Sequence, residues 1–329
     1  MRRNRRRKPR GRFKFLRFIF LIIVIFIAIL FFKNRLVGGG PLSTTSIANE
    51  GFLENLNFFD RIIKPKRKYK SDYIYLLDRE TGDELEKKEH RKEIYPASLT
   101  KMMTVLVALE NIEDLSEISP VDVDTYQDMV AEGASMAGFY GREPVTYRDL
   151  LYGTMLRSGG EAANSLAVNI SGDVPSFVKL MNDKAKEIGL RNTKFTNPEG
   201  LHNEDQYTTA KDMGKLVDYA LDNPDFKAIF TRPEFTTTST LDHPGGILLR
   251  STVLSKLSLE DQDGFKILGG KSGTTYEAGQ CWATLGEKDG KEYIAIVMGT
   301  PLEDIKNPSN NHIEDTLNLY QMIEGEYKS

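Results

Sequence analysis

Along most of the chain, apolar residues recur at spacings that predict a hairpin, then a block of helices, then more strands and a closing helix. Residues 73–77 are strand-like, and the turn-forming residues 78–83 predict that a second strand follows in a hairpin. Apolar side chains at helical spacing indicate buried or amphipathic helices. Such helices are predicted at 98–112, at 175–188 with Gly189 as a stop signal, and at 209–221.

A capping box marks the start of another helix, which we expect to run through Leu156. Thr146 and Asp149 have the spacing at which each side chain bonds the other residue's backbone N–H. Toward the C-terminus the period changes. Strands are predicted at 265–268, 280–285 and 292–298, the last two joined by a hairpin at 288–291, and a final amphipathic helix at 310–325. This order predicts an α+β fold, with an antiparallel sheet flanked by terminal helices beside a helical lobe from the middle of the chain.

An unbroken apolar run occupies residues 18–32, directly after ten basic residues between Arg2 and Arg17. The run is shorter than the ~20 residues that span a bilayer, but apolar residues from position 13 extend it. The basic flank predicts that the N-terminus stays cytoplasmic and that the rest is exported. No small-residue cleavage site follows, which favours an uncleaved anchor over a removed signal peptide. We therefore expect residues 13–32 to form a transmembrane helix in the lipid bilayer, making the protein a single-pass protein of the cell membrane.

Charge divides the chain into unlike parts. Residues 1–35 carry twelve Lys and Arg and no acid, so with a formal net charge of −3 the remainder sums to −15. The alternative for the basic run is an arm that binds nucleic acid, but the adjoining apolar run explains the charges better, and no nucleic-acid partner is expected. Residues 36–70 are predicted to be a linker, and residues 71–329 an extracytoplasmic catalytic domain.

Cysteine and histidine usage limits the chemistry. With Cys281 alone, no intrachain disulfide is possible, so the folded domain must be stabilised by its own core. The histidines are widely spaced and match no metal-binding pattern. We expect neither a metal site nor any other cofactor. The four histidines are His90, His202, His243 and His312.

The first candidate catalytic motif is Ser98 with Lys101. Ser98 is expected at the N-terminus of helix 98–112, and Lys101 lies three residues later on the same helical face, where its amine can reach the Ser98 hydroxyl. Burial or a second nearby cation would lower the pKa of the lysine and let it act as a base. The spacing alone is weak evidence, because Ser176 and Lys179 repeat it on a helix that we predict to be solvated.

Two further motifs strengthen this interpretation. Residues 157–164 place Ser158 on a glycine-rich loop between two predicted helices. Residues 271–274 place Lys271 at the predicted start of a strand, beside Gly273, whose missing Cβ would let a substrate backbone approach. In the order Ser-x-x-Lys, Ser-x-(Asn), Lys-[Ser/Thr]-Gly, the three segments resemble the motifs of penicillin-recognising serine enzymes.

More closely, the chain resembles the low-molecular-mass D-alanyl-D-alanine carboxypeptidases of peptidase family S11, over about residues 70–326. This resemblance implies a penicillin-binding protein/serine β-lactamase-like fold. It also implies an enzyme that removes the terminal D-Ala from peptidoglycan stem peptides ending in D-Ala-D-Ala and that is acylated by β-lactam antibiotics. The segments that carry it are 95–101, 158–163, 197–200, 208–213 and 271–279.

The resemblance also implies roles for the motif residues. Ser98 attacks the carbonyl of the penultimate D-Ala, Lys101 accepts its proton, and Ser158 relays a proton to the departing amine. The backbone N–H groups of residues 98 and 274 form the oxyanion hole. Charge-assisted hydrogen bonds from the third motif hold the terminal carboxylate. The residues implied in that carboxylate site are Lys271, Ser272 and Thr274.

One departure leaves alternatives open. The family's second motif has asparagine where this chain has Gly160. Losing that amide would cost about 2–4 kcal/mol of transition-state stabilisation unless Asn164 or a water substitutes. One alternative is therefore an envelope penicillin-binding protein with impaired catalysis. A serine β-lactamase is the other: Glu199 and Glu204 lie in the region of its water-activating glutamate, but without the expected sequence context. His202 is expected to be a loop histidine and not a base.

Overall fold

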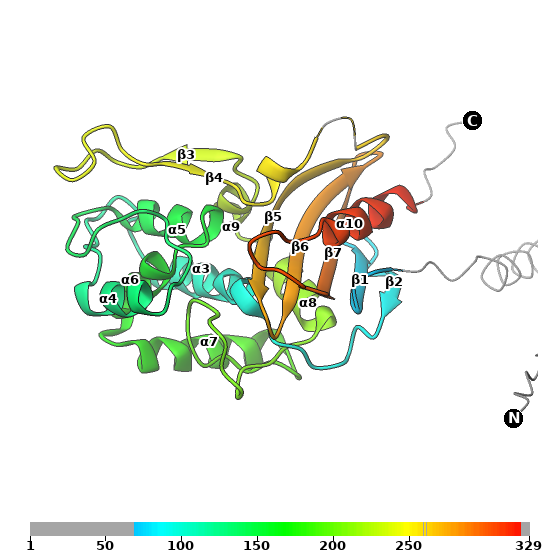
Figure 1. The fold of residues 1–329 in the computed structure, drawn as a ribbon, viewed down its shortest axis with the longest axis horizontal. Coiled ribbons are helices and arrows are strands. Elements are labelled where there is room, and N and C mark those ends of the chain that lie inside the picture. The colour runs from blue at the N-terminus through cyan, green and yellow to red at the C-terminus, as the bar shows by residue number, and fades with distance from the viewer. Residues whose placement is uncertain (1–68, 259, 261, 324–329) are drawn as a thin grey trace, which may run out of the picture. The chain divides into compact units, whose positions relative to one another are not determined.

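The computed structural model describes residues 69–258, 260 and 262–323. In this part of the chain, a five-stranded sheet lies beside a lobe of helices (Figure 1). The strands are β1 (Tyr73–Asp78), β2 (Glu84–Lys88), β3 (Glu234–Thr236), β4 (Leu248–Arg250), β5 (Lys266–Thr275), β6 (Gly279–Lys288) and β7 (Lys291–Thr300). The helices are η1 (Ala97–Leu99), α3 (Thr100–Asn111), α4 (Val123–Ala131), α5 (Tyr147–Leu156), α6 (Gly160–Ser171), α7 (Val174–Ile188), α8 (Ala210–Ala220), α9 (Pro224–Phe230), η2 (Leu254–Lys256) and α10 (Asn311–Gln321).

The large sheet has the strand order β2-β1-β7-β6-β5, and every neighbouring pair is antiparallel. β6 and β7 are joined at Asp289 and Gly290, whose φ angles of 53° and 78° match the mirror-image turn that suits a two-residue hairpin. The predicted hairpin at 288–291 is therefore confirmed. β3 and β4 form a separate two-stranded ribbon, which extends along the helical lobe (Figure 1).

Alternate residues of the central strands face two different cores, as the period of a strand requires. On one face, Ile74 and Leu76 of β1 pack with Tyr320 of α10. On the other face, Tyr75 belongs to the core that includes Met213 of α8. The closing helix was predicted, but the second face is covered by α8 from the middle of the chain. The expectation that terminal helices flank the sheet is thus correct for the C-terminal end only, among the described residues.

The helical lobe surrounds α3, in which residues 100–108 are all buried. This burial explains why its sequence is apolar on nearly every side. The capping box predicted at the start of α5 is present, with Thr146 Oγ1 accepting from Asp149 N at 3.2 Å and Asp149 Oδ2 accepting from Thr146 N at 2.9 Å. Gly189 ends α7 in the left-handed conformation, with φ 79°, as predicted.

Strands β3 and β4 were not predicted, and β5 differs from the prediction. Lys271 does not lie at a strand start but at the sixth position of β5, which runs without interruption through Gly269 and Gly270. Both glycines are sites of close packing: a Cβ on Gly269 would overlap the carbonyl oxygen of Phe230. Because neither glycine has a side chain, the end of α9 and the neighbouring strand β6 can pack directly against β5. The sheet continues through this point with a register shift between Ile267 and Gly269.

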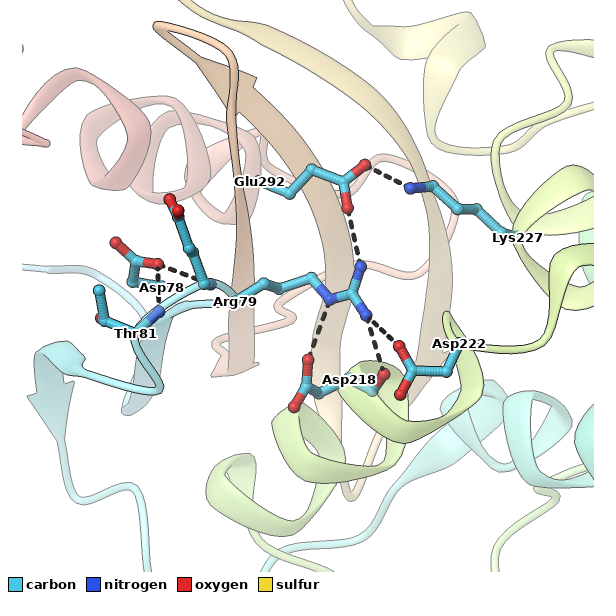
Figure 2. A network of polar contacts seen from close by, with 8 residues as sticks. Asp78, Arg79, Thr81, Asp218, Asp222, Lys227 and Glu292 are labelled. Carbon is cyan, nitrogen blue, oxygen red and sulfur yellow. Dashed lines mark hydrogen bonds and ion pairs between the residues drawn. The ribbon is translucent and has the colours of Figure 1, made fainter.

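Arg79, directly after β1, joins several elements at one end of the sheet. Its guanidinium lies 2.9 Å from Asp218 Oδ1, 2.8 Å from Asp222 Oδ1 and 2.7 Å from Glu292 Oε2. Lys227 Nζ of α9 contacts the second oxygen of Glu292 at 2.5 Å. Figure 2 shows the arginine at the centre of this network, which connects the β1–β2 turn to α8, α9 and β7.

The beginning of the described chain is fastened to its last helix. Ser71 donates to Asp315 Oδ2 from both its backbone N and its hydroxyl, each at 2.7 Å, and Lys70 N donates to Oδ1 at 3.3 Å. Asp315 is buried on α10. The chain therefore enters the sheet through a fixed point.

The predicted N-terminal segment 1–35 lies outside the described residues, as does all but the end of the predicted linker 36–70. Within the part of the chain that the structure describes, no helix is both long enough and apolar enough to cross a bilayer.

Candidate active site

Ser98 lies where β5, at the edge of the sheet, meets the first turn of the buried helix. It belongs to η1, which leads directly into α3. Ala97, just before it, has φ 47°, a left-handed conformation that is uncommon outside glycine and often found at functional sites. A Cβ on Gly273 of β5 would lie 2.9 Å from Ser98 N. The glycine of the third motif therefore admits the backbone of the candidate nucleophile, a role that the sequence did not predict.

Lys101 points at Ser98, as the first motif predicts. Its Nζ donates to Ser98 Oγ at 3.2 Å and also to the carbonyl oxygen of Glu199. The lysine is 3% exposed. Burial lowers its pKa from the usual value to about 8, against the opposing charges of Glu199 and Glu161. An amine that loses its proton this readily, beside a hydroxyl, has the geometry of a general base and its nucleophile.

The second and third motifs meet at Ser158 and Lys271. Lys271 is fully buried, and its Nζ donates to Ser158 Oγ at 2.9 Å and to Ser272 O at 2.7 Å. Burial, and then the charge of Lys101, lower the pKa of Lys271 well below its usual range. Ser158 itself has φ 62°. A lysine-bound hydroxyl on a constrained backbone is suited to passing a proton.

Hydroxyl groups form the accessible part of the third motif. Ser272 is half-buried, and its Oγ lies 2.7 Å from Thr252 Oγ1. Thr274, two residues further on the same face of β5, is exposed. Because the amine of Lys271 is enclosed, these hydroxyls are the groups of the motif that a ligand can touch. Thr252 was missed by the sequence analysis, since no motif marks it.

Gly160 is the first residue of α6, and its neighbourhood leaves little room for a side chain. A Cβ at this position would lie 2.9 Å from Met129 Sδ and 3.3 Å from the Cβ of Ala134. Asn164, one turn later, donates its amide to Gly160 O at 3.0 Å and to Glu199 Oε2 at 3.1 Å. The nearest asparagine is thus engaged with the backbone of the second motif and with a buried acid.

The loop 197–200 is fixed beneath the first motif. Asn197 Oδ1 accepts from Gly200 N at 2.7 Å, and Thr104 of α3 donates to the carbonyl of Pro198 at 2.6 Å. Gly200 has φ +81°, and a Cβ there would overlap the carbonyl oxygen of Ala97. Only glycine meets both conditions, so the loop and the nucleophile turn are packed as one unit.

The remaining candidates lie elsewhere. Lys179, the second half of the repeated Ser-x-x-Lys spacing, has a side chain that is 76% exposed and pairs with Asp183 at 2.7 Å, which confirms its solvated position. His202 stacks edge-on against Tyr95, with ring centroids 4.6 Å apart, and lies 3.9 Å from Glu277. Within residues 69–323, apart from the two that are not described, no cluster of His, Cys, Asp or Glu is placed to hold a metal ion.

Comparison with known proteins gives consistent matches. A family model described as D-alanyl-D-alanine carboxypeptidase, Peptidase S11, matches residues 61–301. The D-alanyl-D-alanine carboxypeptidase DacF of Bacillus subtilis is 32% identical over 231 residues, covering 69% of this chain and 57% of that protein. DacA of Haemophilus influenzae is 31% identical, covering 69% and 56%. The chain therefore spans little more than half the length of these relatives.

Solved structures agree with the sequence matches. The Streptomyces K15 DD-transpeptidase superposes with a TM-score of 0.68 at 27% identity, covering 78% of this chain and 98% of that one. Penicillin binding protein 5 from Haemophilus influenzae gives 0.67 at 26% identity, covering 78% and 71%. The predicted α+β fold of the penicillin-binding type is thus confirmed for the described part of the chain.

Proposed function

Because this chain belongs to the D-alanyl-D-alanine carboxypeptidases of peptidase family S11, we propose that it is a serine-type hydrolase that removes the terminal D-Ala from peptidoglycan stem peptides. The observation that carries the proposal is the 3.2 Å contact between Ser98 Oγ and Lys101 Nζ. A hydroxyl at a helix N-terminus beside a buried amine supplies the nucleophile and the general base that acyl transfer needs when no metal takes part.

Acylation begins with Ser98. Its O–H bond breaks as Oγ bonds to the carbonyl carbon of the penultimate D-Ala, and the proton moves to Lys101 Nζ. The backbone N–H groups of residues 98 and 274 stabilise the oxyanion that develops on the carbonyl oxygen. The peptide C–N bond then breaks as Ser158, held by Lys271, gives its hydroxyl proton to the leaving amine and takes up in its place the proton that Lys101 accepted. Free D-alanine departs, and the acyl-enzyme remains.

Substrate selection rests on the terminal carboxylate. The hydroxyls of Ser272 and Thr274 receive it directly, while the enclosed amine of Lys271 contributes positive charge from behind when protonated. Water then hydrolyses the ester on Ser98 and restores the enzyme. β-Lactams enter the same route by opening their ring on Ser98, and they leave slowly because the acyl group remains attached to the leaving nitrogen.

The assay that tests this function measures free D-alanine released from a peptide ending in D-Ala-D-Ala. Release by the wild-type chain and none by Ser98→Ala would support the carboxypeptidase and its nucleophile. A folded wild-type chain that labels with penicillin but releases no D-alanine would favour the second candidate, a penicillin-binding protein of impaired catalysis. Gly160 with Met129 in the adjoining space is the observation that favours this candidate. Rapid turnover of a chromogenic cephalosporin would instead indicate a β-lactamase.

We also propose, from the sequence, that residues 13–32 anchor the protein in the cell membrane as a single span, with the catalytic domain outside the cytoplasm. The basic flank and the uninterrupted apolar run support this topology. Fractionation of cells that express the full chain, with protease added outside the membrane, tests it. A chain recovered in the soluble fraction, or one protected from the protease, would contradict the proposal.

A further inference from the structure

Glu199 is a buried acid that contacts the first motif with one end and the second motif with the other. Its carbonyl oxygen accepts from Lys101 Nζ, and its side-chain Oε2 accepts from Asn164 of α6. The residue is 5% exposed. Since Gly200 and Asn197 fix the loop on either side of it, the acid cannot turn out into solvent without unfolding that loop.

Other charged groups surround this acid and its lysine. Burial raises the pKa of Glu199 and Glu132, at the end of α4, adds to this, while Lys101 of α3 is the cation that favours the ionised form. Lys101 in turn faces the carboxylates of Glu199 and Glu161, and its charge acts on Lys271 of β5. Glu161 Oε1 accepts from the backbone N of Ala137 at 2.7 Å, while its buried Oε2 has no hydrogen-bond partner among the described residues. Of these two acids, Glu199 is the one whose carbonyl oxygen accepts from Lys101 and whose carboxylate accepts from Asn164.

We propose that Glu199 is a positioning residue for Lys101: its carbonyl holds the amine on the Ser98 hydroxyl, and its carboxylate, held by Asn164, stabilises the ammonium that forms when Lys101 takes the serine proton. The inference rests on the acyl-enzyme chemistry proposed above. When ionised, the buried Glu199 carboxylate is a fixed negative charge, and such a charge acts strongly on a charge that appears during the reaction and needs no reorganisation.

The same charge has a second effect of opposite sign. A neighbouring carboxylate favours protonated Lys101 in the resting enzyme as well, which reduces the fraction of neutral base at a given pH. Glu199→Gln, which keeps an acceptor for Asn164 but removes the charge, therefore changes two observables in opposite senses. The acid limb of the acylation rate moves to lower pH by about one unit. The plateau rate at high pH falls about tenfold, because the proton goes to a weaker base.

The experiment uses the full chain in detergent micelles and measures the second-order rate of labelling by a fluorescent penicillin from pH 6 to pH 10. Glu204→Gln is the matched control, because it removes an exposed acid from the same segment, and its profile should coincide with wild type. If the acid limb of the Glu199→Gln acylation profile does not move, the proposal is overturned, even if the rate falls. A purely structural role would lower the rate at every pH without moving the acid limb.

A second variant guards against a misfolded first one. Asn164→Leu removes the donor to Glu199, so the buried carboxyl takes up a proton and the acid limb again moves to lower pH. An unmoved limb in this variant would also overturn the proposal. Failure of the proposed function is separate: if wild-type Ser98 is not labelled at any pH, the acyl-enzyme chemistry is wrong. If it labels normally but both variants keep the wild-type limb, only the role of Glu199 is wrong.

Discussion

The sulfur of Met129 lies 2.9 Å from the point that a Cβ on Gly160 would occupy. The methionine belongs to α4 and the glycine opens α6, so the packing of these two helices leaves little room for a side chain at position 160. Restoring the asparagine must therefore be tested together with the methionine.

Gly160→Asn alone should destabilise the protein by about 1–3 kcal/mol, because the added side chain must displace Met129. Combined with Met129→Ala, which removes the displaced side chain, the substitution should regain stability. The double variant should release D-alanine about tenfold faster than wild type if the native site lacks a needed donor. Urea unfolding and the D-alanine assay measure the two effects. Equal activity of the double variant and wild type would indicate that the native site lacks no needed donor.

Lys101→Ala should reduce acylation by penicillin at least about 100-fold, the usual contribution of a general base. The fold should survive, since a buried amine is exchanged for a small apolar group. Lys179→Ala is the matched control, because Lys179 has the same spacing from a serine, but its exposed amine pairs with the surface carboxylate of Asp183. A comparable loss in the control would mean that the wrong motif has been assigned.

The acylation rate of the wild-type chain should rise with pH. Lys101 acts as a base only when neutral, and burial lowers its pKa to about 8. Below that value the neutral fraction, and with it the rate, should fall about tenfold per pH unit. Labelling by fluorescent penicillin between pH 6 and pH 9 measures the limb. A rate that is constant over this range would contradict the assignment of Lys101 as the base.

His312 should make the fold sensitive to acid. Its ring packs edge-on against Trp282, its Nδ1 is buried with no hydrogen-bond partner among the described residues, and burial lowers its pKa to about 4. As pH falls below about 6.5, the unfolded state binds a proton on this histidine that the folded state does not bind. The free energy of unfolding therefore declines until about pH 4. The loss is about 3 kcal/mol. His312→Phe should keep the packing and flatten this part of the curve, as thermal unfolding at pH 4.5 and pH 7 will show.

Arg79→Leu should lower the free energy of unfolding by about 2 kcal/mol, since three carboxylates around the guanidinium would lose their shared cation (Figure 2). Arg250→Leu is the control: its side chain is 63% exposed and meets only Glu234, at 3.5 Å, so the change should stay within about 0.5 kcal/mol. Urea titrations of both variants make the comparison. Equal losses would mean that the network contributes no more than one surface ion pair.

The sequence predicted those elements whose signals are local. Thr146 with Asp149 marked the start of α5, and Gly189 marked the end of α7, because capping depends on residues within one turn. The continuity of β5 was missed because Gly269 and Gly270 resemble strand breakers. Their purpose is visible only once α9 and β6 lie against them.

In the candidate site, too, residues with a local sequence signal were predicted and contacts that depend on tertiary packing were not. The serines and lysines were found because their spacings match a known pattern, and the structure brings Ser158 to Lys271 across 113 positions of sequence. The importance of the Glu199 carbonyl could not be predicted, because a backbone oxygen leaves no trace in residue type. The contact between Met129 and Gly160 depends on how α4 meets α6, which no periodicity encodes.

The hydrogen bonds between Ser71 and Asp315 have a mechanical consequence. β1 lies between β2 and β7, so a pull along the chain at residue 70 would load two rows of inter-strand hydrogen bonds in shear, the direction in which they must break together. Asp315 adds a clamp to the last helix at the point where that force enters. Tension from that side would thus be borne by the sheet and α10, and the turn that carries Ser98 and the loop that carries Ser158 would be spared the load.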